Sequence, residues 1–300
     1  MWQQLLEDIN NGEVKGLARA ISFIENEEKG FEELLRSLPE NTKAQIIGVT
    51  GPPGAGKSTL VDGLISEMIA AGKKVAVLCV DPSSPFNLGA LLGDRIRMSS
   101  WYTHPDVFIR SLATRGSLGG MHPKIIEITE LAKAAGFEYI IVETVGVGQS
   151  EVEIAGLADT TVVVLVPEGG DEVQTMKAGV MEIADIFVVN KSDRPGADGF
   201  IKNLRQMLAP AFSTHAREIP IIKTVASEKK GLKELFEAIE ENNAAASVNK
   251  KKSWLLAEKA YYIIQNKRIK DISKDSLRKD IEERMEKGKF NLYQFTSDYI

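Results

Sequence analysis

Residues 45–59 read Gln-Ile-Ile-Gly-Val-Thr-Gly-Pro-Pro-Gly-Ala-Gly-Lys-Ser-Thr. The stretch begins as an apolar run typical of a strand, passes through a glycine-rich loop and continues into a segment that favours a helix. The spacing Gly51-x-x-x-x-Gly56-Lys57-Ser58 is the pattern of a loop whose backbone N–H groups surround phosphate oxygens at a helix N-terminus. The sequence therefore predicts a site for a nucleoside triphosphate. The residues expected to contact it here are Gly51, Pro52, Pro53, Gly54, Ala55, Gly56, Lys57, Ser58 and Thr59.

Two side chains give this loop its expected chemistry. Lys57 is expected to reach the β- and γ-phosphates and to offset the charge that develops there during phosphoryl transfer. The Ser58 hydroxyl is expected to ligate Mg²⁺, which prefers oxygen ligands. We therefore predict a catalytic role for Lys57 and a metal-binding role for Ser58.

Short runs rich in Val and Ile recur on both sides of the loop, and segments able to form helices separate them. The runs at 75–80, 139–143 and 161–166 are apolar without alternation, as is typical of strands buried on both faces. Strands that alternate with helices indicate an α/β fold, here a P-loop NTPase with a mostly parallel sheet covered by helices on both faces. In such sheets ligands bind beyond the carboxyl ends of the strands.

The pattern divides the chain into three parts. Residues 1–43 are expected to form a helical extension, because apolar residues recur at helical spacing before the break at Pro39 and Asn41. Residues 44–242 are expected to form the P-loop domain. Residues 243–300, which follow a polar stretch without periodicity, are expected to form a C-terminal helical arm.

A second motif, Asn190-Lys-Ser-Asp193, follows the predicted strand 186–190. In P-loop GTPases this motif reads the base: the aspartate accepts hydrogen bonds from guanine N1–H and the exocyclic amine, a donor pair that adenine lacks. Asn190, Lys191 and Asp193 are therefore candidate guanine-binding residues. Thr224-Val-Ala-Ser227 loosely matches the Ser-Ala motif that backs the base in many GTPases, which makes Ala226 a further candidate.

Acidic residues follow two other predicted strands. Glu143-Thr-Val-Gly146 ends the run 139–143, so Glu143 is expected to hold magnesium, directly or through water, and the Gly146 N–H to sense the γ-phosphate. Asp81 follows the run 75–80, and Asp94 comes thirteen residues later. These two acids are candidates for magnesium binding and catalysis, although an ordinary polar loop explains them equally well.

The segment from Glu168 to Lys177 contains two glycines and several charges after a buried strand, which indicates a mobile loop or simply a solvated one. A net charge of −5 gives no bulk attraction to nucleic acid or to anionic lipid, and neither is expected as a partner. The one cysteine, Cys79, cannot form an intrachain disulfide. No apolar run approaches the roughly 20 residues of a membrane span, and we expect a cytoplasmic protein.

Taken together, these motifs resemble the MeaB family, also called ArgK, whose members are GTPases that accompany adenosylcobalamin-dependent methylmalonyl-CoA mutase and its relatives. The resemblance covers nearly the whole chain. It is carried by the segments Leu17–Asn26, Gly48–Thr59, Val80–Pro85, Leu92–Met98, Glu143–Glu151 and Asn190–Asp193.

The resemblance implies more than spacing does. It implies that Asp81, Asp94 and Glu143 lie near magnesium and the γ-phosphate. It implies a mobile loop that couples the nucleotide state, GTP or GDP, to the mutase, and a homodimer formed through the C-terminal arm. Members of the MeaB family hydrolyse GTP to GDP and phosphate, gate the loading of adenosylcobalamin and protect or reactivate the mutase, and the resemblance implies the same activities here. The partner-coupling residues implied here are Asp171, Glu172, Gln174 and Lys177.

Three alternatives stay open at this point. The first is an ATPase or kinase that assists uptake of basic amino acids, against which Asn190–Asp193 argues. The second is a GTPase that inserts nickel or zinc, although the chain has no cluster of Cys and His residues for such a metal. The third is a scaffold that uses nucleotide only to hold its fold.

Overall fold

The computed structural model describes residues 1–40, 43–81, 98–114, 121–144, 150–168, 183–212, 219–245, 250–269, 272–288 and 290–299. The chain forms two compact units, Met1–Lys252 and Ser253–Ile300. The first unit contains the N-terminal helices together with the sheet. The boundary expected at residue 243 falls inside a helix of this unit, α11 (Leu232–Ala245).

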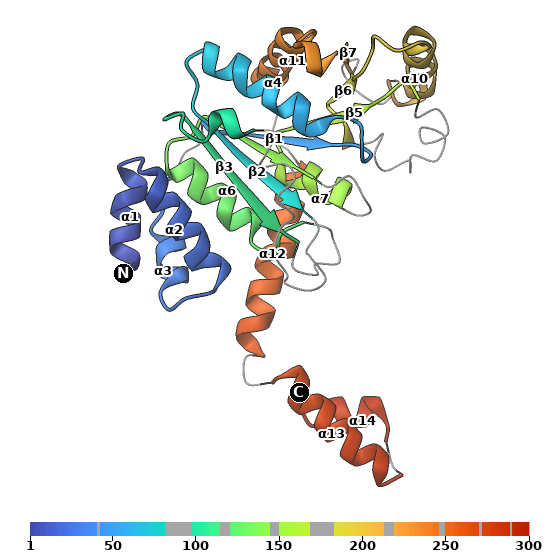
Figure 1. Ribbon diagram of the computed structural model, residues 1–300. Helices are drawn as coiled ribbons and strands as arrows, with labels where there is room; N and C mark the ends of the chain where they lie inside the picture. The colour runs from blue at the N-terminus through green and yellow to red at the C-terminus, as the bar shows by residue number, and fades with distance from the viewer. Residues whose placement is uncertain are drawn as a thin grey trace. The chain divides into compact units, whose positions relative to one another are not determined.

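A single parallel sheet forms the centre of the first unit, as the sequence predicts (Figure 1). In the part of the chain that the structure describes, it has seven strands in the order β3-β2-β4-β1-β5-β6-β7, and every neighbouring pair is parallel. The loop of residues 51–56 therefore leaves the sheet from its centre, between the ends of β4 and β5. The strands are β1 (Gln45–Thr50), β2 (Val75–Asp81), β3 (Val107–Ala113), β4 (Tyr139–Glu143), β5 (Thr160–Leu165), β6 (Ile186–Val189) and β7 (Ile221–Lys223).

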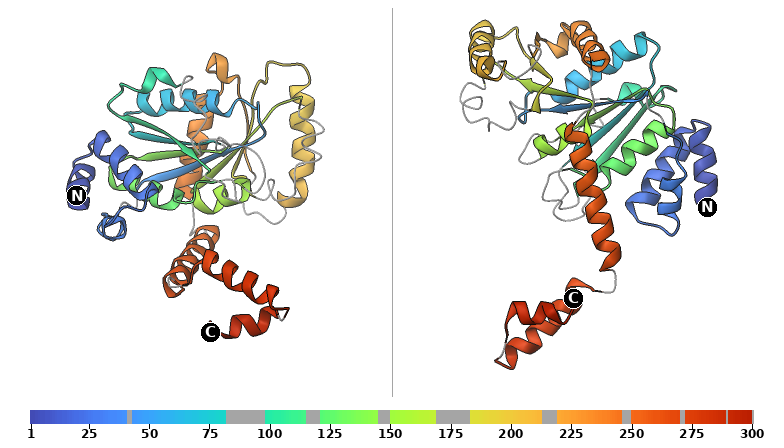
Figure 2. Two further views of the ribbon diagram at one scale, coloured as in Figure 1. Left: turned by 60° about the horizontal axis from the view of Figure 1, so that its bottom comes forward. Right: turned by 180° about the vertical axis from the view of Figure 1, so that it is seen from behind.

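Helices cover both faces of this sheet (Figure 2). On one face, α4 (Lys57–Ala70) and α11 pack on side chains that alternate along the strands, such as Val162 and Val164 of β5. On the other face, α10 (Ala197–Phe212) packs on the intervening side chains, and α6 (Ile125–Ala134) and α7 (Ser150–Leu157) cover the strands nearer the centre. Burial on both faces explains why the strands read as continuous apolar runs.

The N-terminal helices α1 (Trp2–Asn10), α2 (Val14–Glu25) and α3 (Phe31–Arg36) form a further layer outside α6 (Figure 1). Apolar side chains of α2 spaced three and four apart are fully buried, among them Leu17, Ile21 and Ile24. This spacing places them on one helix face, so burial of that face holds the layer against the sheet domain.

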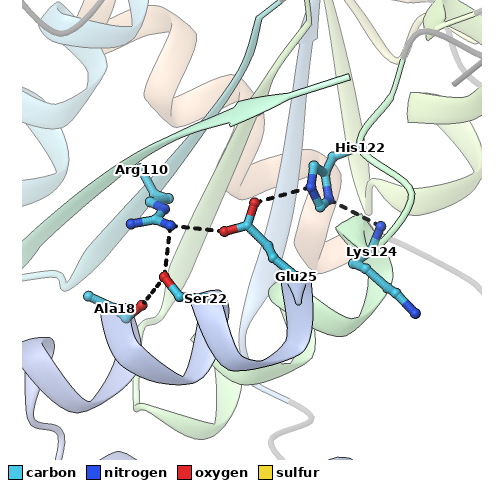
Figure 3. Close-up of polar contacts among 6 residues, drawn as sticks. All are labelled: Ala18, Ser22, Glu25, Arg110, His122 and Lys124. Carbon is cyan, nitrogen blue, oxygen red and sulfur yellow. Dashed lines mark hydrogen bonds and ion pairs between the residues drawn. The ribbon is translucent and has the colours of Figure 1, made fainter. Parts of the chain in front are cut away.

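A partly buried polar contact also joins this layer to the sheet (Figure 3). Glu25, at the end of α2, accepts a hydrogen bond of 2.9 Å from Arg110 Nη2 of β3, and the same nitrogen donates to Ser22 Oγ at 3.1 Å. His122 Nε2 lies 3.3 Å from the other Glu25 oxygen, in a less well aligned contact. His122 Nδ1 accepts from Lys124 N–H at 3.1 Å, so the ring hydrogen lies on Nε2 and faces Glu25.

The environment of Glu25 keeps it ionised. Burial raises the pKa of Glu25, but the close contact with His122, the hydrogen bond from Arg110 and the Arg110 charge outweigh burial and lower this pKa to about 2. Because the pKa is lower in the folded chain than its ordinary value of 4.5, the ionised carboxylate stabilises the fold. This stabilisation is complete above pH 4.5 and is lost as the pH falls toward 2.

A different set of contacts lies at the amino ends of the strands. Asn242 Nδ2 donates to Thr160 Oγ1 at 2.9 Å, and this hydroxyl donates to Asn243 Oδ1 at 2.7 Å. One turn earlier on α11, Glu240 accepts from the buried Tyr139 hydroxyl, and burial followed by this carboxylate raises the pKa of Tyr139. The end of α11 is therefore fastened at the edge of the sheet opposite the loop of residues 51–56.

The second unit is helical. Its elements are α12 (Lys250–Arg268), which begins just before the unit boundary, α13 (Lys274–Glu286) and α14 (Leu292–Ser297). Large apolar side chains on α12 are exposed, and Trp254 and Tyr261 are 68% and 70% exposed. Trp254, Ala257, Glu258 and Tyr261 line one hollow on this helix. Within the described ranges, none of the helices is long and apolar enough to cross a membrane.

Replacement of Glu25 by Gln tests the polar contact. Glu25→Gln keeps the shape but leaves Arg110 without its counter-ion, so we expect a loss of roughly 1–2 kcal/mol of unfolding free energy at pH 7, because solvent screens part of the interaction. The difference from the unmodified chain should shrink as the pH falls below 4.5. Urea denaturation between pH 3 and 7 measures both effects. The exposed Glu28→Gln is the matched control, and equal pH dependence of both variants would contradict the role given to Glu25.

Candidate nucleotide-binding site

The glycines of the loop are required by what lies next to them. Gly51 has φ +138°, and a Cβ there would lie 2.1 Å from the carbonyl oxygen of Val164 in β5. Gly56 has φ +89°, and a Cβ there would lie 2.4 Å from Asn190 Nδ2. The backbone of β5 and the side chain of Asn190, which follows β6 (Ile186–Val189), thus approach the loop so closely that no side chain fits at either position. α4 begins directly after Gly56, which places its N-terminus against the loop.

Lys57 folds back over the loop. It is buried, and its Nζ donates to the carbonyl oxygens of Gly51 at 2.9 Å and Pro52 at 3.1 Å. The ammonium group is therefore held on the inner side of the loop, where a phosphate oxygen would compete with these two carbonyls for it.

Ser58 and Glu143, both predicted to bind magnesium, are in direct contact. Ser58 Oγ donates to Glu143 Oε1 at 2.7 Å, and both residues are buried. The pairing of β1 with β4, in which Val49 lies opposite Glu143, brings them together. A hydroxyl and a carboxylate are both oxygen ligands, so this donor set fits Mg²⁺.

Other predicted residues of this site are only partly described. Asp81 ends β2, whose neighbour is β4, so its backbone lies at the same edge of the sheet as Glu143. The side chain of Asp81 lies outside the described part of the structure. The predicted residues that lie wholly outside it are Asp94, Gly146, Asp171, Glu172, Gln174 and Lys177.

Asn190 joins three segments at the carboxyl edge of the sheet. Its Nδ2 donates to Ala55 O at 2.9 Å, and its Oδ1 accepts from Thr224 Oγ1 and from Ala226 N–H, each at 3.1 Å. The side chain is almost fully buried. It thus connects the phosphate-binding loop to the segment after β7. Thr224, fully buried at the end of β7, was not among the predicted site residues, although it opens the same Thr-Val-Ala-Ser motif.

Two further contacts hold the base-reading loop. Lys191 has φ +56°, and its Nζ donates to Gly54 O at 2.8 Å, a second bond to the phosphate-binding loop. Ser192 donates from both its N–H and its hydroxyl to Thr224 O. Asp193 follows these anchored residues and is exposed. The pKa of Lys230 is raised first by Glu228 and in a smaller part by Asp193, so this cation lies within electrostatic reach of Asp193.

The structure thus brings the two strongest motifs of the sequence into one site. The loop that fits phosphate and the loop that fits a base are joined through Asn190 and Lys191, and Ser58 and Glu143 lie on the other side of the phosphate loop. Ala226 lies beside the base-reading loop, with its N–H directed at Asn190. Fold and site define a P-loop nucleoside triphosphatase.

Comparison with known proteins identifies the kind of P-loop protein. Residues 17–283 match the family described as methylmalonyl-CoA mutase-associated GTPase MeaB. The chain belongs to this family, as the resemblance in its sequence indicated, and it is a GTPase.

Individual relatives agree with this placement. A Pyrococcus abyssi protein classed as a GTPase is 50% identical over 247 residues, which cover 81% of this chain and 76% of that protein. The fused isobutyryl-CoA mutase of Geobacillus kaustophilus is 35% identical over 283 residues, which cover 88% of this chain and 26% of the mutase. The crystal structure of an LAO/AO transport system kinase is similar, with a TM-score of 0.68 and 26% identity over 99% of this chain and 95% of that one.

Replacement of Asn190 by Ala tests whether this side chain holds the phosphate-binding loop to the segment after β7. Asn190→Ala leaves Ala55 O, Thr224 Oγ1 and Ala226 N–H without these partners, so we expect a loss of about 3 kcal/mol of unfolding free energy and at least tenfold weaker binding of GDP. Urea denaturation and titration with a fluorescent GDP measure these changes. The exposed Asn203→Ala on α10 is the control and should stay within about 0.5 kcal/mol of the unmodified chain. A similarly small change for Asn190→Ala would contradict the assignment.

Proposed function

We propose that this GTPase is a chaperone of an adenosylcobalamin-dependent acyl-CoA mutase. In this role it gates the loading of adenosylcobalamin and protects or reactivates the mutase. The observation that carries the proposal is the relative in which a homologous segment is part of a fused isobutyryl-CoA mutase. Fusion keeps two activities at a high effective concentration, which is useful when they act on each other.

The chemistry of the proposal follows from the site. Lys57 would bind the β- and γ-phosphates and offset the charge that develops as water attacks in line. Ser58 and Glu143 would hold magnesium, with Asp81 and Asp94 nearby, and magnesium when bound neutralises phosphate charge. Asn190, Lys191 and Asp193 would select guanine, with Ala226 at the base.

Coupling to the mutase is proposed to use two segments. One runs from Asp81 to Arg97 and the other from Glu168 to Lys177, and each follows a strand of the sheet at its carboxyl end. Gly146 would sense the γ-phosphate. A change of nucleotide at this edge would alter the segments that begin there, which is the usual way in which P-loop proteins report hydrolysis.

The exposed apolar side chains of α12 support a proposal about assembly. Trp254, Tyr261 and Ile264 are more than half exposed, and such a surface is typical of an interface. We propose that the protein forms a homodimer through the arm of residues 243–300 and acts in the cytoplasm. Sedimentation at micromolar concentration tests this assembly, and a Trp254→Glu, Tyr261→Glu variant should be monomeric.

Guanine selection separates this proposal from the alternative, an ATPase or kinase of amino-acid transport. A similar crystal structure is described as a transport system kinase, which makes this alternative worth testing. Asp193→Asn should lower GTP affinity at least tenfold and raise affinity for xanthosine triphosphate, because the new amide can donate to the additional carbonyl of xanthine. Competition binding with the three triphosphates measures this. Retained GTP preference, or equal affinity of the unmodified chain for ATP and GTP, would contradict guanine selection.

The rate of GTP hydrolysis in the presence of a mutase tests whether that mutase is the client of this GTPase. In excess of the mutase from the same organism, we expect GTP hydrolysis to rise at least fivefold, with methylmalonyl-CoA and isobutyryl-CoA mutases assayed in parallel. Lys57→Ala, which should not bind the triphosphate tightly, controls for contaminating hydrolases. If neither hydrolysis nor GDP release changes with either mutase, the chaperone proposal fails while the assignment as a GTPase stands.

A further inference from the structure

Two threonines to which the sequence motifs assign no role lie between the phosphate loop and the magnesium-binding carboxylate. Thr50 directly precedes Gly51, and Thr144 directly follows Glu143. Thr144 Oγ1 donates to Thr50 Oγ1 at 2.9 Å, and both residues are buried, with exposed fractions of 2% and 0%. The Thr144 backbone N–H also donates to Val49 O at 3.0 Å, which continues the pairing of β1 and β4 by one residue.

Packing alone does not require hydroxyl groups here. Between the first residue of each strand and the threonines, β1 and β4 contain only Ile, Val and Gly, apart from Glu143 itself. Valine has the same branched shape as threonine and the same preference for strands. A buried hydroxyl needs a partner that a methyl group does not, so the threonine pair costs free energy unless its hydrogen bond is made.

The position of the pair gives this bond a consequence for the site. Glu143 is tied through Ser58 to the start of α4, and Thr144 is tied through Thr50 to the end of β1. These two bonds attach consecutive residues of one strand end to the two ends of the phosphate loop. Any displacement of the loop relative to the end of β4 strains one or both bonds.

We propose that Thr50 and Thr144 are a positioning pair for GTP hydrolysis. Their bond sets the separation between the phosphate loop and the end of β4. It thereby sets the placement of the Glu143 carboxylate against the γ-phosphate side of the site. The pair acts on the hydrolytic step more than on nucleotide affinity, because the phosphate loop itself keeps all its own contacts when the bond is lost.

Three variants of the full chain test the pair. Thr144→Val should lower the single-turnover rate of hydrolysis of bound GTP about five- to tenfold, the effect expected for loss of one hydrogen bond, and change the Kd of fluorescent GDP less than twofold. Thr144→Ser, which keeps the hydroxyl, should restore the rate to within twofold. Thr129→Val is the matched control, because Thr129 is also fully buried and hydrogen-bonded, to Ile126 O in α6.

The double variant Thr50→Val, Thr144→Val separates positioning from stability. Both hydroxyls are absent in it, so no buried group lacks its partner, and thermal stability should return close to that of the unmodified chain. Hydrolysis should stay as slow as in Thr144→Val if the bond positions the site. Recovery of the rate together with the stability, or an equal loss of rate and GDP affinity in Thr144→Val, would overturn the proposal. These measurements of hydrolysis, GDP affinity and thermal stability are made without a mutase, so they test the threonine pair separately from the chaperone proposal.

Discussion

The amide of Asn190 is the contact on which the nucleotide site depends most. One buried side chain uses its nitrogen for the phosphate loop and its oxygen for the segment after β7. An amide is suited to this position because it offers a donor and an acceptor on one rigid group. The same nitrogen lies only 2.4 Å from where a Cβ of residue 56 would be, so the glycine of the phosphate motif and the asparagine of the base motif constrain each other.

The order of the strands explains why the other segments of the nucleotide site lie next to one another. β1 lies between β4 and β5, so the phosphate loop emerges next to Glu143 on one side and against the backbone of Val164 on the other. On the edge strand β3, Arg110 binds Glu25, which also approaches His122 before α6. The N-terminal helices are thus joined by an ionised contact as well as by apolar burial, and they belong to the same compact unit as the sheet.

Much of this arrangement could be predicted from the sequence, because the signals are local. Apolar runs predicted the strands, with β4 placed residue for residue, and the motif at 51–58 predicted the loop and the start of α4. The partners could not be predicted, since they depend on strand order. Nothing near Thr50 in the sequence indicates Thr144, and helical spacing in α2 does not indicate that Glu25 reaches Arg110, 85 residues away. The roles assigned to residues such as Asp94 and Lys177 stay predictions.

The contacts of Lys57 and Ser58 indicate how the site would respond to its ligand. Lys57 donates to two neutral carbonyls, and bonds between an ammonium and an ionised phosphate are stronger than these. Phosphate would therefore draw the lysine away from the loop carbonyls. Ser58 already donates its hydrogen to Glu143, so the two oxygen ligands expected for a metal lie side by side. The lysine side chain would adapt to the nucleotide, whereas the Ser58–Glu143 pair is organised in advance, with the Thr50–Thr144 bond beside it.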